Sequence, residues 1–237
     1  MTTWETRKRR KADLSRRIAE GREDAGYCRI VGCTQRTPAA RGTGLSRRAC
    51  RAHEDHYGRH GSYAHGSFPS KVLAPHRQAA EAWLAAHQAD PSVVRGVLGV
   101  QSQYAAAGQH LPATRLAGLP PSERCRAAWA RLRDAKVPPV DVLAAWLAVA
   151  ATIASDPGAD RHSEFQQVQA AKLLHRMASG THRRWERSGP GGSLEATELH
   201  KYPASRGRVL RHLGEQLERV AELVAAPFLE ARKYTST

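Results

Sequence analysis

The chain has 237 residues, enough for one large or two small domains, and 41% of them are hydrophobic. Its 37 Lys and Arg against 22 Asp and Glu leave a net charge of +15, so the expected partner is a polyanion, and first of all nucleic acid. The longest apolar run, from Val142 to Ala154, is shorter than the roughly 20 residues of a membrane span, so we expect a buried helix there and no membrane partner.

The first 26 residues form a basic arm. Five consecutive Lys and Arg at positions 7–11 are followed by the polar stretch 12–15, not by the apolar segment of a signal peptide. We therefore expect the protein to remain in the cytoplasm. The arm is expected to be frayed or disordered without a partner, apart from a short helix from Asp13 to Glu20.

Residues 27–70 are rich in Gly, Ser and His and contain three of the four cysteines. Cys28 and Cys33 form one close pair, and Cys50 and His53 form a second pair after 16 intervening residues. Zinc takes four such thiolate and imidazole ligands in a tetrahedron, and short loops deliver them in pairs. Because a loop-rich stretch of this size cannot fold by apolar burial alone, we predict a zinc module with these four ligands. His56 is an alternative fourth ligand.

These residues resemble a short zinc module of phage and mobile-element proteins, some of which carry an HNH nuclease domain. That module has a Cys-x4-Cys pair, a Gly-Leu step, a Cys-x2-His pair and a basic-aromatic stretch that ends in His-Gly. The matching residues are Cys28, Cys33, Gly44-Leu45, Cys50, His53, Tyr57 and His60-Gly61, with residues 46–49 inserted before Cys50. The resemblance covers residues 27–62 only, and it implies a DNA-associated protein of a phage or transposable element.

From Lys71 the composition changes to Ala, Leu and Val, which predicts a helical domain over residues 71–187. Asp90-Pro91 predicts the start of a helix with one apolar face. The residues of that face are Val93, Val94, Val97 and Leu98. Pro138-Pro139 opens the long apolar run, which is expected to end near Asp156. We find no strand pattern after residue 71.

Residues 188–237 are expected to form a flexible Gly-Pro break and then a C-terminal amphipathic helix that stops near Pro227. The apolar face of this helix has spacings of three and four residues. It consists of Leu210, Leu213, Leu217, Val220 and Val224. We expect this face to pack within the chain, and the alternative is a homodimer or a partner helix bound there.

The predicted fold class is therefore mainly α, a helical domain with a small N-terminal, zinc-stabilised, loop-rich module. We predict a nucleic-acid-binding protein, with DNA favoured over RNA, and identify no catalytic residue. Four protein ligands fill the tetrahedron, so the zinc is expected to be structural. The residues expected to contact phosphates are Arg7, Lys8, Arg9, Arg10, Lys11, Arg16, Arg17, Arg47, Arg48, Arg51 and Arg59.

Two other functions stay open. The histidines between His53 and His65 suggest an HNH-like, metal-dependent nuclease with His56 or His60 as the base. Against it, the chain contains no Asn, the residue that gives HNH its middle letter. The other alternative is an RNA-binding or protein-bridging adaptor.

Overall fold

The computed structural model describes residues 3–20, 26–37, 39–41, 44–46, 48–178, 181–188, 194–201 and 207–235. The chain is mainly α, as predicted, and it divides into two compact units, Met1–Gly66 and Ser67–Thr237. The division precedes the composition change at Lys71 by a few residues. The expected helical domain and the C-terminal helix belong to one unit, not to two.

The first unit contains two helices and a short β-hairpin among its described residues, and contacts between side chains one turn apart stabilise the N-terminal helix. Its elements are α1 (Thr3–Glu20), β1 (Ala39–Arg41), β2 (Gly44–Ser46) and α2 (Arg51–His60). α1 is longer than predicted, because it also covers the basic run that we expected to be frayed or disordered. Side chains one turn apart support it: the Lys8 Nζ lies 5.1 Å from the ring centroid of Trp4, and Arg16 donates to Asp13 at 2.9 Å.

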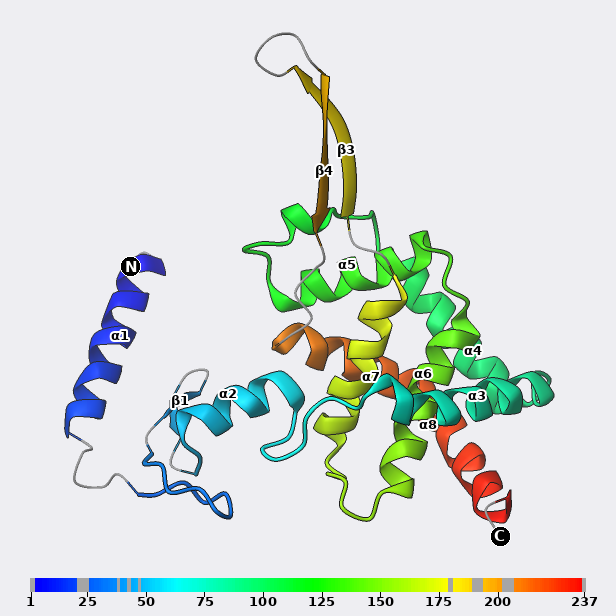
Figure 1. Cartoon of the computed structure of the whole chain (residues 1–237), viewed down its shortest axis with the longest axis horizontal. Coiled ribbons are helices and arrows are strands. Elements are labelled where there is room, and N and C mark those ends of the chain that lie inside the picture. The colour runs from blue at the N-terminus through cyan, green and yellow to red at the C-terminus, as the bar shows by residue number, and fades with distance from the viewer. Residues whose placement is uncertain are drawn as a thin grey trace. The chain divides into compact units, whose positions relative to one another are not determined.

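The ribbon of α6 (Pro139–Ser155) lies among the other helices of the second unit (Figure 1). Every residue of α6 from Val142 to Ile153 is buried. A helix that is apolar on all sides needs neighbours all round, as predicted for this run. The other helical elements are α3 (Ser70–Ala86), α4 (Pro91–Ala106), the 3-10 turn η1 (Ala113–Arg115), α5 (Pro121–Asp134), α7 (Ser163–Met177) and α8 (Arg208–Thr235). No helix in the described ranges has the length and apolar content needed to cross a bilayer.

The buried face of α4 differs from the prediction, although the helix begins after the predicted Asp90 cap. Val94 and Leu98 are 41% and 56% exposed. Gly96 instead lies against α8, where an added Cβ would stand 2.9 Å from the side chain of Val224. The two helices approach so closely that the contact is made through glycine, which a search for apolar spacing does not detect.

α8 does not stop at Pro227 but runs through it to Thr235. Phe228 is fully buried, with its ring centroid 5.6 Å from that of Trp83 on α3. The burial of this aromatic ring holds the helix against the core past the proline, so the predicted end was wrong.

The predicted apolar face of α8 packs within the unit. Four of its five residues, Leu210, Leu213, Leu217 and Val224, are fully buried in the core, and Val220 is partly buried. Intramolecular packing was the expected use of this face. A homodimer or partner helix through the same side chains stays a prediction, and it would require them to leave the core.

A β-hairpin interrupts the helices of the second unit, contrary to our expectation of no strands after residue 71. β3 (Thr181–Ser188) pairs antiparallel with β4 (Leu194–Lys201) along its whole length (Figure 1). The expected Gly-Pro break falls between the strands, where residues 189–193 lie outside the described residues. Charged residues replace the apolar alternation that identifies a half-buried strand, and the register pairs Arg184 with Glu198.

Replacing Pro227 with Ala is expected to raise the free energy of unfolding by about 1–2 kcal/mol, because Ala restores a backbone N–H in the interior of α8. Urea denaturation followed by circular dichroism measures the change. Pro91→Ala is the matched control, since Pro91 occupies the first turn of α4, where the N–H has no intrahelical acceptor. A lower midpoint for Pro227→Ala than for the wild type would contradict this explanation.

Candidate metal centre

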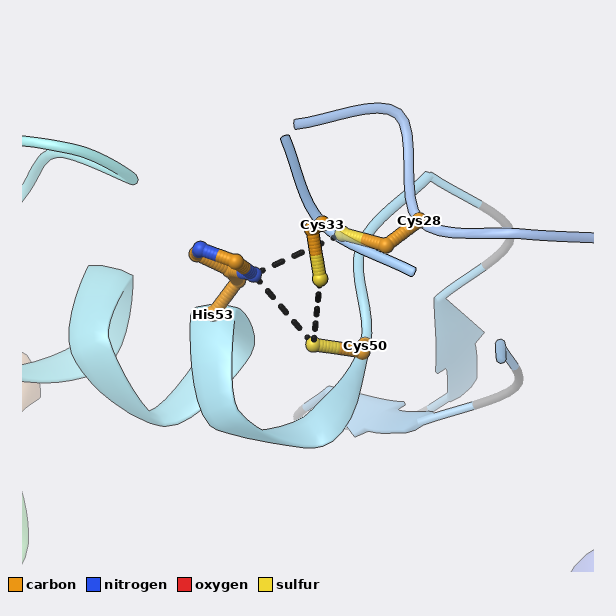
Figure 2. Close-up of side chains that lie close together, drawn as sticks. All are labelled: Cys28, Cys33, Cys50 and His53. Atoms are coloured by element: carbon orange, nitrogen blue, oxygen red, sulfur yellow. Dashed lines mark hydrogen bonds between the residues drawn. The ribbon is translucent and has the colours of Figure 1, made fainter. Parts of the chain in front are cut away.

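Four side chains of the first unit meet around one point (Figure 2). They are Cys28, Cys33, Cys50 and His53, and their ligand atoms all lie within 4.8 Å of one another. The Nδ1 of His53 is 3.2 Å from the Sγ of Cys50 and 3.5 Å from the Sγ of Cys28. The Sγ atoms of Cys33 and Cys50 are 3.9 Å apart, and all three cysteines are free thiols.

These separations match the edges of a small tetrahedral site. Metal–sulfur bonds of about 2.3 Å and metal–nitrogen bonds of about 2.0 Å place tetrahedral ligand atoms roughly 3.5–3.8 Å from one another. The observed contacts of 3.2, 3.5 and 3.9 Å bracket that range. The four residues therefore have the geometry and the donor atoms to hold a metal ion.

The first pair of ligands lies on a tight turn. The N–H of Cys33 donates to the carbonyl of Ile30 at 3.0 Å, and Gly32 has a φ of 79°, in the left-handed region that glycine adopts without strain. The N–H of Cys28 donates to the carbonyl of Gln35 at 2.8 Å, which ties together the two sides of the turn. The turn thus brings both thiols to one place.

The second pair opens α2. Cys50 is the N-cap residue, with an extended ψ of 168°, and its carbonyl accepts the N–H of Glu54 at 2.9 Å. His53 follows three residues later in the first helical turn, so it lies on the same side as Cys50. The N–H of Arg29 donates to the carbonyl of Arg48 at 2.8 Å. This hydrogen bond links the start of α2 to the tight turn that carries Cys28 and Cys33.

His53, and not His56, joins the cysteines. The Nδ1 of His56 is 2.9 Å from the carbonyl oxygen of Ser62, and because a carbonyl only accepts, this nitrogen carries the proton. The ring of His56 also stacks on that of His60, with centroids 4.5 Å apart. The histidines proposed for a nuclease are therefore divided between two different environments.

Packing around the ligands is slight. Among the described residues, the buried apolar cluster of this unit consists of Cys28, Ala49 and Cys50, with three partly buried neighbours at its edge. Burial disfavours the thiolate of Cys28, but hydrogen bonds from the backbone of Cys50 and Ile30 outweigh it and lower the pKa of Cys28, whereas burial and the neighbouring thiols raise the pKa of Cys33. A thiolate is the form of cysteine that binds metals.

The other residues of the resemblance have structural roles. Gly61 ends α2 with a φ of 76°, and its N–H donates to the carbonyl of Tyr57 at 2.8 Å. The ring of Tyr57 stacks on that of Tyr63, with centroids 4.5 Å apart. Gly44-Leu45 lies in β2. The left-handed φ of Gly61 and its hydrogen bond to Tyr57 explain why a glycine follows His60 at the end of α2.

The predicted phosphate-binding residues of α1 are only partly described. Lys8, Arg9 and Lys11 are exposed, and Arg16 is exposed but paired with Asp13. Arg47 lies outside the described residues, as do the side chains of Arg7, Arg10 and Arg17.

Three further predicted residues lie in α2 or just before it. Arg48, Arg51 and Arg59 are all exposed. The Nε of Arg51 is 3.9 Å from the carboxylate of Asp55, and the Nε of Arg59 donates to the carbonyl of Asp55 at 3.2 Å. Arg51 and Arg59 are carried by the helix that carries His53, so their positions depend on the same local fold.

Sequence reasoning missed a second exposed feature next to the first pair of ligands. Tyr27 is 63% exposed and pairs with Arg36 in an isolated antiparallel bridge. The guanidinium of Arg36 lies 5.9 Å from the centroid of the Tyr27 ring. Both residues flank the Cys-x4-Cys pair. Their position next to predicted metal ligands was the feature of the sequence that could have identified them.

No protein-family model, curated protein or solved structure was found to match this chain. The site is therefore defined by its ligand atoms and their distances.

Proposed function

We propose that the first unit is a zinc module that binds nucleic acid, with DNA favoured over RNA. The observation that carries the proposal is the convergence of three thiols and one imidazole within 4.8 Å. Thiolate and imidazole ligands in a tetrahedron are characteristic of zinc, whereas Mg²⁺ and Ca²⁺ prefer oxygen. Because four protein ligands leave no open position for water, the zinc would have a structural role.

The structural role of the zinc would be to fix basic side chains for contact with phosphates. Arg48 and Arg51 flank Cys50 in the sequence, and Arg59 lies on the same helix as His53. Residues 1–71 contain 16 Lys and Arg against 7 Asp and Glu, an excess of +9 that favours a polyanion. The exposed ring of Tyr27 beside Arg36 suits stacking on a base.

The resemblance of residues 27–62 to the module of phage and mobile-element proteins supports a setting in such an element. The same resemblance keeps an HNH-like nuclease as the first alternative, with an RNA-binding or protein-bridging adaptor as the second. The proposal and its two alternatives predict different results when the protein is titrated with DNA and with RNA.

We expect the full-length protein to bind duplex DNA with a strong salt dependence. With about four phosphate contacts, raising the salt from about 50 to 200 mM is expected to weaken binding roughly 100-fold. Fluorescence anisotropy with labelled duplex DNA, single-stranded DNA and RNA, with Mg²⁺ present, measures this. Arg51→Ala should reduce the salt slope by about one, because it removes one phosphate contact.

Arg126→Ala is the matched control, an exposed arginine of the second unit that pairs with Glu123. This variant is expected to leave the salt slope unchanged. Cleavage of the DNA would replace the binding proposal with the nuclease alternative, and tighter binding of RNA would favour the adaptor. Absence of binding to all three nucleic acids at low salt would contradict the proposal.

A further inference from the structure

A cavity of about 590 Å³ opens among three helices of the second unit. One wall follows α3 and the turn after it, where the lining residues recur at every third or fourth position from Glu81 to Gln88 and so lie on one face. Residues of α4 and of the first turn of α6 form the other walls. The volume falls within the range of about 300–1,000 Å³ that small-molecule pockets occupy. The cavity is therefore large enough for a small organic ligand.

Leucine and valine side chains line most of this cavity. Leu84 and Val93 are buried, and Val97 and Val140 are partly buried. The apolar surface continues outside the cavity on α4, where Leu98 is 56% exposed. A ligand with an apolar body would remove this surface from water, which is favourable in proportion to the area covered.

Both charged residues that line the cavity are acidic. Glu81 lies on α3, where its carboxylate accepts from the Nε of Arg77 at 2.7 Å and its side chain is 42% exposed. Asp141 is half-buried in the first turn of α6 and has no ion-pair partner in the part of the chain that the structure describes. The cavity therefore combines apolar walls with a negative charge that no neighbouring basic side chain balances.

We propose that this cavity binds an amphipathic organic cation, that is, an apolar chain or ring that carries an ammonium group. The apolar body would lie against the leucine and valine walls, and the ammonium group would pair with Asp141, with Glu81 as a second acceptor. An ammonium group has only donors, which match the acceptor-only carboxylates. The charge of the ligand follows from the charge of the lining residues.

The chemistry of this site is opposite to that of the proposed nucleic-acid contact. The chain as a whole carries +15 and attracts anions, whereas no Lys, Arg or His is among the described residues that line the cavity. Phosphates would be repelled by the two carboxylates. The site belongs to the second unit, so it goes beyond the function proposed for the zinc module and does not depend on it.

Isothermal titration calorimetry of the full-length protein with three ligands that share one alkyl tail tests the proposal. The ligands are octylammonium, 1-octanol and octanoate. We expect one octylammonium to bind per chain, octanol to bind more weakly, and octanoate to bind most weakly. The net charge of +15 by itself predicts the reverse order for the two ions, so the expected order is specific to the cavity. Wild-type protein that binds octanoate as tightly as octylammonium would overturn the proposal.

Asp141→Asn keeps the shape of the side chain and removes its charge. The affinity of this variant for octylammonium should fall about tenfold, and its affinity for octanol should stay unchanged. Asp156→Asn is the matched control, because Asp156 is exposed at the other end of α6. Equal losses of octylammonium affinity in the two variants would contradict the role of Asp141.

A variant that fills the cavity tests its apolar part. Ala85 lines the cavity and is exposed, so the ring of Ala85→Phe can occupy the space without disturbing the buried core. This variant should bind both octylammonium and octanol more weakly than the wild type. Sedimentation velocity tests a second copy as the occupant: a wild-type dimer that Ala85→Phe converts to monomers would overturn the proposal. Absence of octylammonium binding to the wild type at about 1 mM would overturn it as well.

Discussion

Replacing both Cys28 and Cys33 with Ser is expected to unfold the first unit and to leave the second folded. Structural zinc contributes on the order of 10 kcal/mol to the folding of modules of this size, and the few buried apolar side chains around these ligands cannot replace it. The second unit has its own core around α6. Limited trypsin digestion followed by mass spectrometry should show rapid cleavage within residues 26–66 and protection of residues 67–178.

Two single variants serve as a matched pair for this experiment. His53→Ala removes a ligand and should increase cleavage in the same region, whereas His56→Ala removes a nearby histidine that lies outside the cluster. Chelation of the metal in the wild type should reproduce the effect of the double variant. If the double variant resisted trypsin as well as the wild type, the first unit would be stable without its metal site and this explanation would fail.

The second large effect is expected at Gly214, where α8 crosses α7. An added Cβ would stand 2.6 Å from both the Cβ and the backbone oxygen of Gln167, which is closer than packed atoms tolerate. Because backbone atoms cannot rotate away, Gly214→Ala should lower the free energy of unfolding by about 3 kcal/mol, even though Ala is the better helix former.

Chemical denaturation followed by circular dichroism measures this change. Arg219→Ala, at an exposed position of the same helix, is the control and should stay within about 0.5 kcal/mol of the wild type. A Gly214→Ala protein as stable as the wild type would show that α7 and α8 separate without cost, in conflict with the close packing described above.

The cluster of four side chains that could hold a metal ion was predictable from the sequence, because metal chemistry restricts both the residue types and their spacing. Cys28 and Cys33 need a turn that Gly32 permits, and Cys50 and His53 need one turn of helix. The sequence placed His53 and His56 close to Cys50, and spacing favoured His53. The carbonyl of Ser62, which engages His56, became visible only in the structure.

The helices with a continuous apolar pattern, above all α6, could also be predicted from the sequence. The end of α8 was not, because Pro227 predicts a stop and only the burial of Phe228 against Trp83 overrides it. The β3–β4 hairpin was missed because its residues are largely polar and charged. The burial of Arg131 has no signal in the sequence, because the hydrogen bond from its Nη2 to His175 on α7 becomes visible only in the structure.

Metal analysis of the purified protein, combined with X-ray absorption at the zinc edge, tests the central claim most directly. The account predicts one zinc per chain, with three sulfur ligands at about 2.3 Å and one nitrogen ligand at about 2.0 Å. It also predicts that His53→Ala loses the nitrogen ligand and that His56→Ala keeps it. Wild-type protein that is folded without stoichiometric metal, or a spectrum dominated by oxygen ligands, would contradict the assignment of Cys28, Cys33, Cys50 and His53 as a zinc site.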